Sequence, residues 1–178
     1  SEILVVDPDG NPVPRDGSAA GEIIVRSEAN MLGYWRRPDL TEKTLRDGWM
    51  WTGDIATWDA EGYVFIVDRA KDMIISGGEN IYSTQVEAAI HQHPAVLESA
   101  VFGIPDDTWG EAVKAVVVLK PGQTATEADI IAEASKHLAS YQKPKSVDFV
   151  EALPKAPTGK ILKRDLRDPY WQDGARQV

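Results

Sequence analysis

The alternation of apolar and polar positions over the first 67 residues predicts several short β-strands. β-branched and aromatic residues recur in short runs between clusters of Asp, Asn, Gly and Pro, which favour turns. The runs that predict strands are residues 3–6, 22–26, 50–52, 54–58 and 63–67. The last two flank a Gly-containing turn at 59–62 and therefore indicate a hairpin. Residues 39–46 predict a short helix, with Asp39 as its N-cap and Gly48 just past its end.

After Asp68 the pattern changes, and predicted helices and strands alternate. Helices are expected to begin with Ser83 and Thr126 as N-caps, the second supported by Asp129, and a last helix to begin at about Ile161. The runs that predict strands in this part are residues 73–76, 96–102, 113–119 and 147–150. This alternation is typical of a compact α+β domain.

These patterns together predict an α+β chain with two domains. A small, β-barrel-like subdomain is expected at residues 1–70, followed by a compact α+β domain at 71–178. The boundary is placed between Asp68 and Asp72, where a polar stretch separates the two patterns.

Composition excludes several classes of protein. Of the 178 residues, 43% are apolar and 26% are charged, which excludes a disordered tail and a fibrous repeat. The absence of cysteine excludes a disulfide scaffold and a thiol nucleophile. No apolar run approaches the ~20 residues of a transmembrane helix, and no basic-then-apolar leader begins the chain, so a cytoplasmic location is expected.

The distribution of charge gives a further indication about ligands. The net charge of −9 argues against a nucleic-acid partner. Residues 1–135 carry 10 basic and 23 acidic residues, a balance of −13, whereas residues 136–178 carry 9 basic and 5 acidic residues, a balance of +4. The basic segment fits either a solvated surface or a docking surface for a phosphorylated small molecule, and composition alone does not choose between them.

Three short motifs place polar groups or glycines where a ligand could bind. Asp54 can accept hydrogen bonds from a diol such as a ribose, or simply bond its own turn. Gly77 and Gly78 permit either close approach of a ligand or a structural turn. Lys160 precedes a predicted helix and can neutralise a phosphate or carboxylate, although most lysines are simply exposed.

Aromatic and basic residues elsewhere offer a possible nucleotide surface. Tyr141, Lys143 and Lys145 place a ring and two cations on one segment, and Trp109 could provide a second stacking surface. An exposed loop and a half-buried tryptophan explain the same residues without a ligand. No metal site is expected, because the only close histidine pair, His91 and His93, has no evident third ligand.

Several spaced motifs run through nearly the whole chain, from about residue 3 to residue 171. Together they closely resemble the C-terminal third of the adenylate-forming superfamily, which contains acyl-CoA synthetases, aryl-CoA ligases, luciferases and peptide-synthetase adenylation domains. The end of the chain is most similar to bacterial fatty-acyl-CoA synthetases. The motifs are Gly33-Tyr34-Trp35, Asp47-Gly48-Trp49, Thr52-Gly53-Asp54, residues 68–82, Trp109-Gly110-Glu111, Lys143-Pro144-Lys145 and Pro157-Thr158-Gly159-Lys160.

The resemblance implies a ligase with two half-reactions. A carboxylic acid, here expected to be a fatty acid, attacks the α-phosphate of MgATP to give an acyl-adenylate, and the thiol of CoA then displaces AMP. In such enzymes the small C-terminal domain rotates between the two steps. ATP, Mg²⁺ and CoA are therefore the expected substrates and cofactors of the full-length enzyme, with none bound tightly to this chain.

The resemblance also assigns roles to single residues. Lys160 matches the catalytic lysine of adenylation, and Lys71 matches the hinge residue. Asp54 and Arg69 match residues that contact the nucleotide. The residues that match CoA-contacting positions are Gly77, Gly78, Trp109, Tyr141, Lys143 and Lys145, the two glycines lining the pantetheine tunnel.

The phosphate-binding loop and the acyl pocket of the family have no counterpart in these 178 residues. The chain alone is therefore expected to be inactive and to act with a large N-terminal domain in cis. The acyl group and the oligomeric state do not follow from these residues. Two alternatives stay open: a non-catalytic module that binds a nucleotide or a partner protein, and another adenylate-forming enzyme such as an aryl-CoA ligase or a peptide-synthetase adenylation domain.

Overall fold

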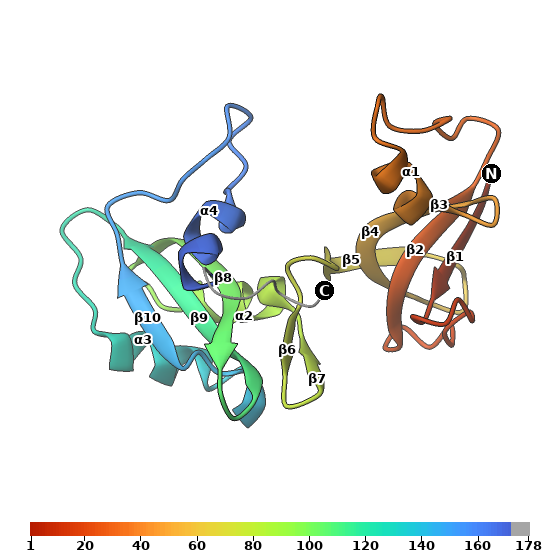
Figure 1. The fold of residues 1–178 in the computed structure, drawn as a ribbon. Coiled ribbons are helices and arrows are strands. Elements are labelled where there is room, and N and C mark those ends of the chain that lie inside the picture. The colour runs from red at the N-terminus through yellow and green to blue at the C-terminus, as the bar shows by residue number, and fades with distance from the viewer. Residues whose placement is uncertain (172–178) are drawn as a thin grey trace. The chain divides into compact units, whose positions relative to one another are not determined.

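The computed structural model describes residues 1–171, which form two compact units (Figure 1). The first unit is Ser1–Lys71, and the second begins at Asp72. This division lies one residue from the expected boundary between residues 70 and 71. Among the described residues, no helix is both long enough and apolar enough to cross a membrane.

The first unit is one curled antiparallel sheet with a short helix (Figure 1). Strand order is β1-β2-β4-β3, and β5 also pairs with β4. Val5, Ala56 and Trp58 form its small core, and the indole of Trp58 donates to the carbonyl of Val13. The elements are β1 (Glu2–Val6), β2 (Ala20–Arg26), α1 (Pro38–Thr44), β3 (Leu45–Arg46), β4 (Trp49–Trp58) and β5 (Val64–Arg69).

The expected N-cap of α1 is wrong by two residues. Arg37, not Asp39, occupies the cap, and Pro38 follows it inside the helix. Proline favours the first helical position because its fixed φ suits the helix and its missing N–H would be unpaired there in any case. The Asp39 carboxylate instead pairs with the Arg37 guanidinium at 2.6 Å.

The end of the same predicted helix is also wrong. Leu45 and Arg46 leave the helix and pair with β4 as strand β3. Asp47 and Gly48 link the two strands with φ of 50° and 82°. Two successive residues with positive φ form the tight hairpin loop that matches the twist of antiparallel strands.

The second unit is a mixed sheet covered by helices on both faces. Strand order is β10-β9-β6-β7, with β8 also on β9; β10 is parallel to β9, and the other pairs are antiparallel. This arrangement confirms the α+β fold. The elements are β6 (Ile74–Ser76), β7 (Glu79–Ile81), α2 (Ser83–Ile90), β8 (Val96–Asp106), β9 (Gly110–Leu119), α3 (Glu127–Ala134), β10 (Ser146–Phe149) and α4 (Lys163–Arg167), with 3₁₀ turns at Ser140–Gln142 and Asp168–Tyr170.

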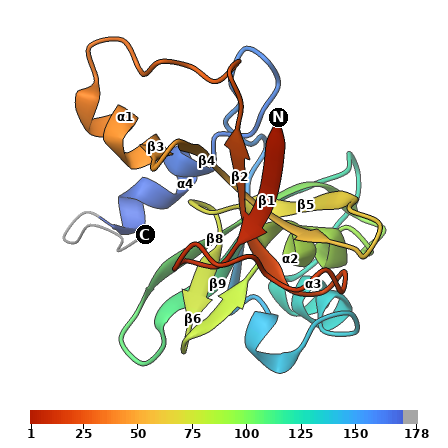
Figure 2. The same ribbon diagram turned by 90° about the vertical axis from the view of Figure 1, so that its right-hand side faces the viewer.

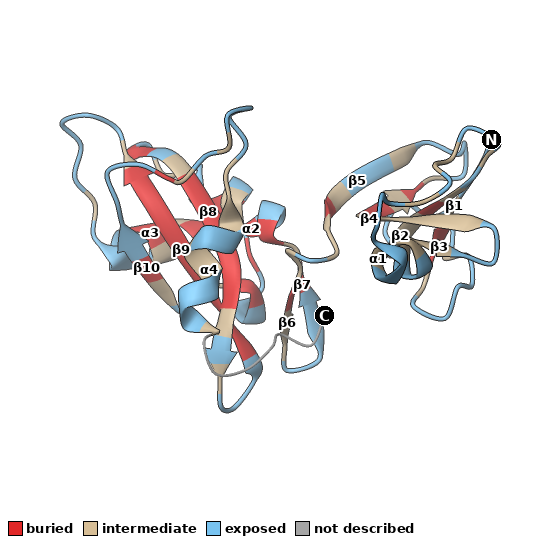
Figure 3. Cartoon of the chain, turned by 45° about the horizontal axis from the view of Figure 1, so that its top comes forward, coloured by how far each residue is buried: buried red, intermediate tan, exposed pale blue. Residues whose placement is uncertain are grey.

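Strands β8 and β9 are buried on both faces (Figure 3). Side chains alternate between two cores, as the two-residue period of a strand requires. One core contains Val101, Val113, Ala115 and Val117 with apolar residues of α2 and α3. The other contains Ala100, Phe102, Val116, Val118 and Leu153, with Ile161 and Leu166 of the α4 region packed against it. The nearly continuous apolar runs in these strands therefore reflect a sheet between two layers.

The predicted helix starts of this unit have different outcomes. Thr126 caps α3 in a capping box with Asp129, as expected. Ser83 does not cap α2: Tyr82 is the cap residue, and Ser83 is the buried first residue of the helix, where its hydroxyl accepts from Lys163 Nζ at 2.7 Å. The Ser83 hydroxyl, which the local pattern predicted to cap the helix, therefore binds a lysine that is distant in the sequence. The last helix begins at Lys163, two residues after Ile161.

Candidate functional site

The paired glycines form the tight loop of the β6–β7 hairpin. Ser76 pairs with Glu79, so Gly77 and Gly78 are the two loop residues, with φ of 60° and 86°. A β-carbon at Gly77 would lie 2.8 Å from Cε3 of Trp109, too close for a real contact, whereas one at Gly78 would meet nothing within 4 Å in this chain. Glycine is therefore required at both positions by the backbone, and at Gly77 also by the indole.

A pocket of about 350 Å³ opens beside this hairpin in the second unit. Its wall combines the hairpin, the start of β9 and the segment before β10. Trp109 and Tyr141 are about half exposed and offer aromatic surface to a ligand. The lining residues are Ser76, Gly77, Glu79, Trp109, Ala112, Val113, Ser140, Tyr141, Lys143 and Lys145. Five of the six residues expected to contact CoA therefore line one pocket, and Gly78 lies next to it in the hairpin loop.

Asp106 organises one side of this pocket, a role that the sequence reasoning missed. Its carboxylate accepts from the backbone N–H groups of Thr108 and Trp109 at 3.0 and 2.9 Å, and from Lys145 Nζ at 2.8 Å. The Lys145 hydrogen bond and the backbone donors hold the pKa of Asp106 below its usual value of 3.8. An aspartate two residues before a turn amide is a recognisable turn signal, but its bond to Lys145 is not local.

Gln142 fixes the segment that carries Tyr141 and Lys143. This buried side chain accepts from the Ala139 N–H at 3.0 Å and donates to Oε1 of Gln85 in α2 at 2.9 Å. The adjacent aromatic and basic side chains are thereby attached to a helix that is far away in sequence.

The two predicted nucleotide residues of the first unit lie directly opposite each other. Asp54 of β4 is in register with Arg69 of β5, and Asp54 Oδ1 lies 2.7 Å from Arg69 Nε, without the alignment of a hydrogen bond. Both side chains are partly exposed. Gly53 precedes Asp54 with φ of 71°, and its N–H donates to the Glu22 carboxylate at 2.8 Å. The Thr52-Gly53-Asp54 segment is thus fixed from a neighbouring strand.

Lys160 lies on an exposed loop before α4. The Ala156 N–H donates to the Lys160 carbonyl, and the Gly159 N–H donates to the Ala156 carbonyl, each at 2.8 Å. No carboxylate pairs with the Lys160 ammonium within residues 1–171. Figures 1 and 2 place this loop at one end of the second unit and the tip of the β6–β7 hairpin at the other.

The chain matches known proteins along nearly its whole length. Residues 85–160 match the AMP-binding enzyme C-terminal domain. The fatty acid–[acyl-carrier-protein] ligase ScoC of Streptomyces coeruleorubidus is 44% identical over 98% of this chain and 33% of its own length. A feruloyl-CoA synthase of an Amycolatopsis species is 47% identical over 94% of this chain and 34% of its own length.

Solved structures agree with the sequence matches. The ATP-bound MatB of Rhodopseudomonas palustris is 40% identical and superimposes with a TM-score of 0.87 over 95% of this chain and 34% of that chain. The apo form of the same protein, at 41% identity and the same coverage, gives a TM-score of 0.65.

The chain belongs to the adenylate-forming superfamily. It spans about one third of the length of the relatives it matches. The matched family domain covers α2 to Lys160, so it includes the pocket residues Trp109, Tyr141, Lys143 and Lys145. The β6–β7 hairpin and the Asp54–Arg69 pair lie before it, in the part matched by the longer relatives.

The sequence motifs named the predicted site residues but not the residues that hold their segments in place. Asp106, Gln142 and Glu22 each bond a backbone amide or side chain of a predicted site segment. Their partners are set by tertiary pairing, which motif spacing within one segment does not contain.

Proposed function

We propose that the full-length protein is an AMP-forming ligase that activates a carboxylic acid with ATP and transfers the acyl group to CoA. The observation that supports this most strongly is the pocket beside the β6–β7 hairpin, which gathers aromatic, cationic and glycine residues from three separate segments. Such a lining suits a thiol ligand with a phosphorylated end, because ring surfaces pack against its apolar parts and cations pair with its phosphates.

The first half-reaction would use Asp54, Arg69 and Lys160. The Asp54 carboxylate can accept hydrogen bonds from vicinal ribose hydroxyls, while Arg69 holds that carboxylate in position. Lys160 would neutralise the charge that develops between the acid and the α-phosphate. Its exposed loop, and an ammonium that pairs with no carboxylate of residues 1–171, suit a group that meets its ligand only when the rest of the enzyme is in place.

The second half-reaction would use the pocket. Trp109 and Tyr141 would pack against the adenine or pantetheine portion, and Lys143 and Lys145 would pair with phosphates. The Lys145 ammonium donates to the Asp106 carboxylate, which holds this cation in a fixed position at the pocket.

A hinge at Lys71 would let Lys160 and the pocket of the second unit act in turn, one in each half-reaction. Lys71 is the last residue of the first unit.

We assign neither an acyl pocket nor Mg²⁺ ligands to this chain. Residues 1–171 contain no cluster of three or more His, Asp or Glu side chains suited to a metal ion. A fatty acid is our proposed substrate class. The names of the relatives give two acids: a fatty acid for ScoC, which is 44% identical to this chain, and ferulic acid for the feruloyl-CoA synthase, which is 47% identical.

The acceptor thiol has a second candidate. ScoC is named as a ligase that uses an acyl-carrier protein, at 44% identity. A carrier protein presents the same pantetheine arm, so the pocket suits both. Thioester formation measured in parallel with CoA and with a phosphopantetheinylated carrier protein would decide between them.

The test of the whole proposal is a separation of the two half-reactions in the full-length enzyme. Lys160→Ala is expected to depress ATP–pyrophosphate exchange strongly and to spare thioester formation from a supplied acyl-adenylate. Gly78→Leu is expected to do the reverse. Lys136→Ala, which removes only an exposed ion pair with Glu133, is the control for both. Equal loss of both half-reactions in Lys160→Ala would contradict the assignment.

The isolated 178-residue chain is proposed to be inactive, because it holds only part of the catalytic centre. Pyrophosphate exchange by the purified chain, with a panel of carboxylic acids, would contradict this.

A further inference from the structure

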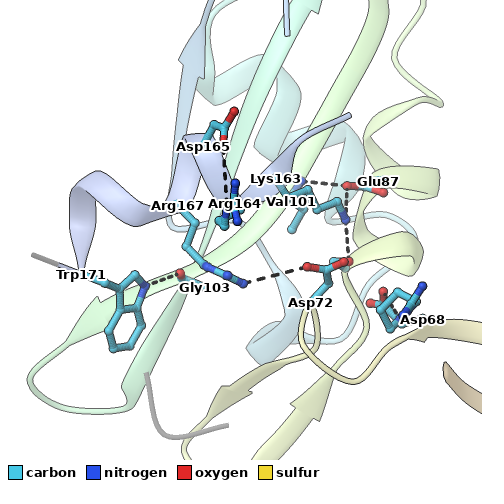
Figure 4. Close-up of polar contacts among 12 residues, drawn as sticks. Asp68, Asp72, Glu87, Val101, Gly103, Lys163, Arg164, Asp165, Arg167 and Trp171 are labelled. Carbon is cyan, nitrogen blue, oxygen red and sulfur yellow. Dashed lines mark hydrogen bonds and ion pairs between the residues drawn. The ribbon is translucent and has the colours of Figure 1, made fainter. Parts of the chain in front are cut away.

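Lys163 lies three residues after Lys160 and, unlike a solvated surface lysine, forms an ion pair and a hydrogen bond that are largely shielded from water. Its ammonium lies 2.7 Å from Oε1 of Glu87 and donates to the Ser83 hydroxyl at 2.7 Å (Figure 4). The side chains of Lys163 and Glu87 are only 15% and 19% exposed. An ion pair with so little access to water is screened far less than an exposed one.

Glu87 connects this ion pair to the central sheet. Its Oε1 also accepts from the N–H of Val101 at 2.8 Å (Figure 4). Val101 belongs to β8, whose partner strand in the described residues is β9, so the N–H on the other edge of β8 needs an acceptor. The edge of the sheet therefore holds the Glu87 carboxylate in place independently of its ion pair with Lys163.

The loop that carries Lys160 is itself exposed, and the nearest contacts that hold it are the packing of Ile161 against the core around Phe102 and the hydrogen bond from the Leu162 N–H to the Pro154 carbonyl at 2.8 Å. Residues 157–160 are all exposed, and α4 has no buried residue. A short bridge between Lys155 and Ile161 closes the base of the loop. Lys155 forms an ion pair with Glu98, but those side chains are 40% and 32% exposed, and such pairs contribute little.

Two further contacts hold the chain after Lys163 on the same side of the unit. Arg167 of α4 lies 3.9 Å from the Asp72 carboxylate, and the indole N–H of Trp171 donates to the Gly103 carbonyl at 3.1 Å (Figure 4). Thus α4 is fixed at its beginning by Lys163 and at its end by Arg167. Asp72 is the first residue of the second unit, next to the proposed hinge residue Lys71.

We propose that Lys163 is a positioning residue for Lys160. By pairing with Glu87 and Ser83 it fixes the first turn of α4, and with it the exposed loop, on α2 and the edge of β8. Only two residues separate Lys160 from Lys163, so a change in the position of Lys163 shifts the Lys160 backbone directly. A misplacement of about 1 Å can cost roughly 100-fold in rate. This inference rests on the proposed role of Lys160 in adenylation.

The test uses the full-length enzyme and the two half-reactions. Lys163→Met is expected to lower the rate of pyrophosphate exchange by about 10- to 100-fold and to leave thioester formation from a supplied acyl-adenylate within about twofold of wild type. Lys163→Arg keeps the cation and is expected to restore most of the exchange rate. Lys136→Met, which removes the ion pair of an exposed lysine with Glu133 elsewhere in the same unit, is the matched control and should change neither rate.

A second variant separates positioning from misfolding. Lys163→Met alone leaves the Glu87 carboxylate without its cation, which can destabilise the unit. In the double variant Lys163→Met/Glu87→Gln no charge is left, and the Gln side chain still offers an oxygen to the Val101 N–H. The same selective loss of exchange is expected in this variant.

The outcomes separate this inference from the proposed function. Unchanged exchange in Lys163→Met, equal loss of both half-reactions in the double variant, or failure of Lys163→Arg to restore exchange would each overturn the positioning role. If Lys160→Ala, assayed beside them, keeps full exchange, the proposed role of Lys160 is wrong, and the positioning role is overturned with it.

Discussion

Alanine at Gly77 and at Gly78 separates the two reasons for glycine in the β6–β7 hairpin. Both residues have positive φ, 60° and 86°, which costs an L-residue about 1–2 kcal/mol. Only at Gly77 does the added β-carbon meet another group: the Trp109 ring must retreat from 2.8 Å to an ordinary contact of 3.4 Å or more. Because Trp109 is half exposed and can move, we expect this to add about 1 kcal/mol, at the low end for overpacking.

Gly77→Ala should therefore destabilise the second unit by about 2–3 kcal/mol and Gly78→Ala by about 1–2 kcal/mol. Urea unfolding of the 178-residue chain, followed by hydrogen exchange of the β9 amides, measures the stability of that unit separately. A Trp109→Ala background completes a double-mutant cycle.

In that background the extra cost of Gly77→Ala should disappear, because the ring is absent. A coupling energy of about 1 kcal/mol exceeds the ~0.3–0.5 kcal/mol scatter of independent sites. Equal costs at the two glycines, or an unchanged Gly77→Ala cost without the indole, would refute the interpretation that Trp109 requires glycine at position 77.

Three further predictions concern the second unit. Lys145 and the backbone donors lower the pKa of Asp106, so the stability that its carboxylate contributes is complete above pH 3.8 and is lost as the pH falls through the lowered pKa. The difference in the free energy of unfolding between wild type and Asp106→Asn should therefore shrink on acidification. A difference that stays constant with pH would contradict this prediction. A β-carbon at Gly103 would clash with the buried Glu111 carboxylate, so Gly103→Ala should lower the free energy of unfolding, measured in urea, by about 2–4 kcal/mol. A cost under about 1 kcal/mol would show that Glu111 moves freely. Thr126→Ala removes the α3 cap and should cost about 1 kcal/mol in thermal unfolding, unless the helix begins elsewhere.

Local chemistry explains which elements could be predicted. Apolar runs bounded by turn residues identified most of the strands, and Thr126 with Asp129 identified a capping box, because these signals act within a few residues. Strand β7 and strand β3 escaped prediction, since each has only two or three residues and exists through pairing with a neighbour.

The site residues divide in the same way. Motif chemistry and family resemblance named Lys160, Asp54 and the pocket residues, because such signals lie within short segments of the sequence. Their neighbours could not be predicted: Asp106 bonds Lys145 across 39 residues and Glu87 bonds Lys163 across 76. Only the folded sheet brings such pairs within hydrogen-bonding distance.

The sequence by itself therefore determined the class of fold and supplied the predicted site residues, since periodicity and functional-group chemistry are properties of short segments. The tertiary structure decided which of these side chains share a pocket, which hydroxyl caps a helix and which is taken by a distant lysine, and what holds the Lys160 loop. Those outcomes depend on groups that are far apart in the chain and become neighbours only when both faces of the β8–β9 sheet are buried.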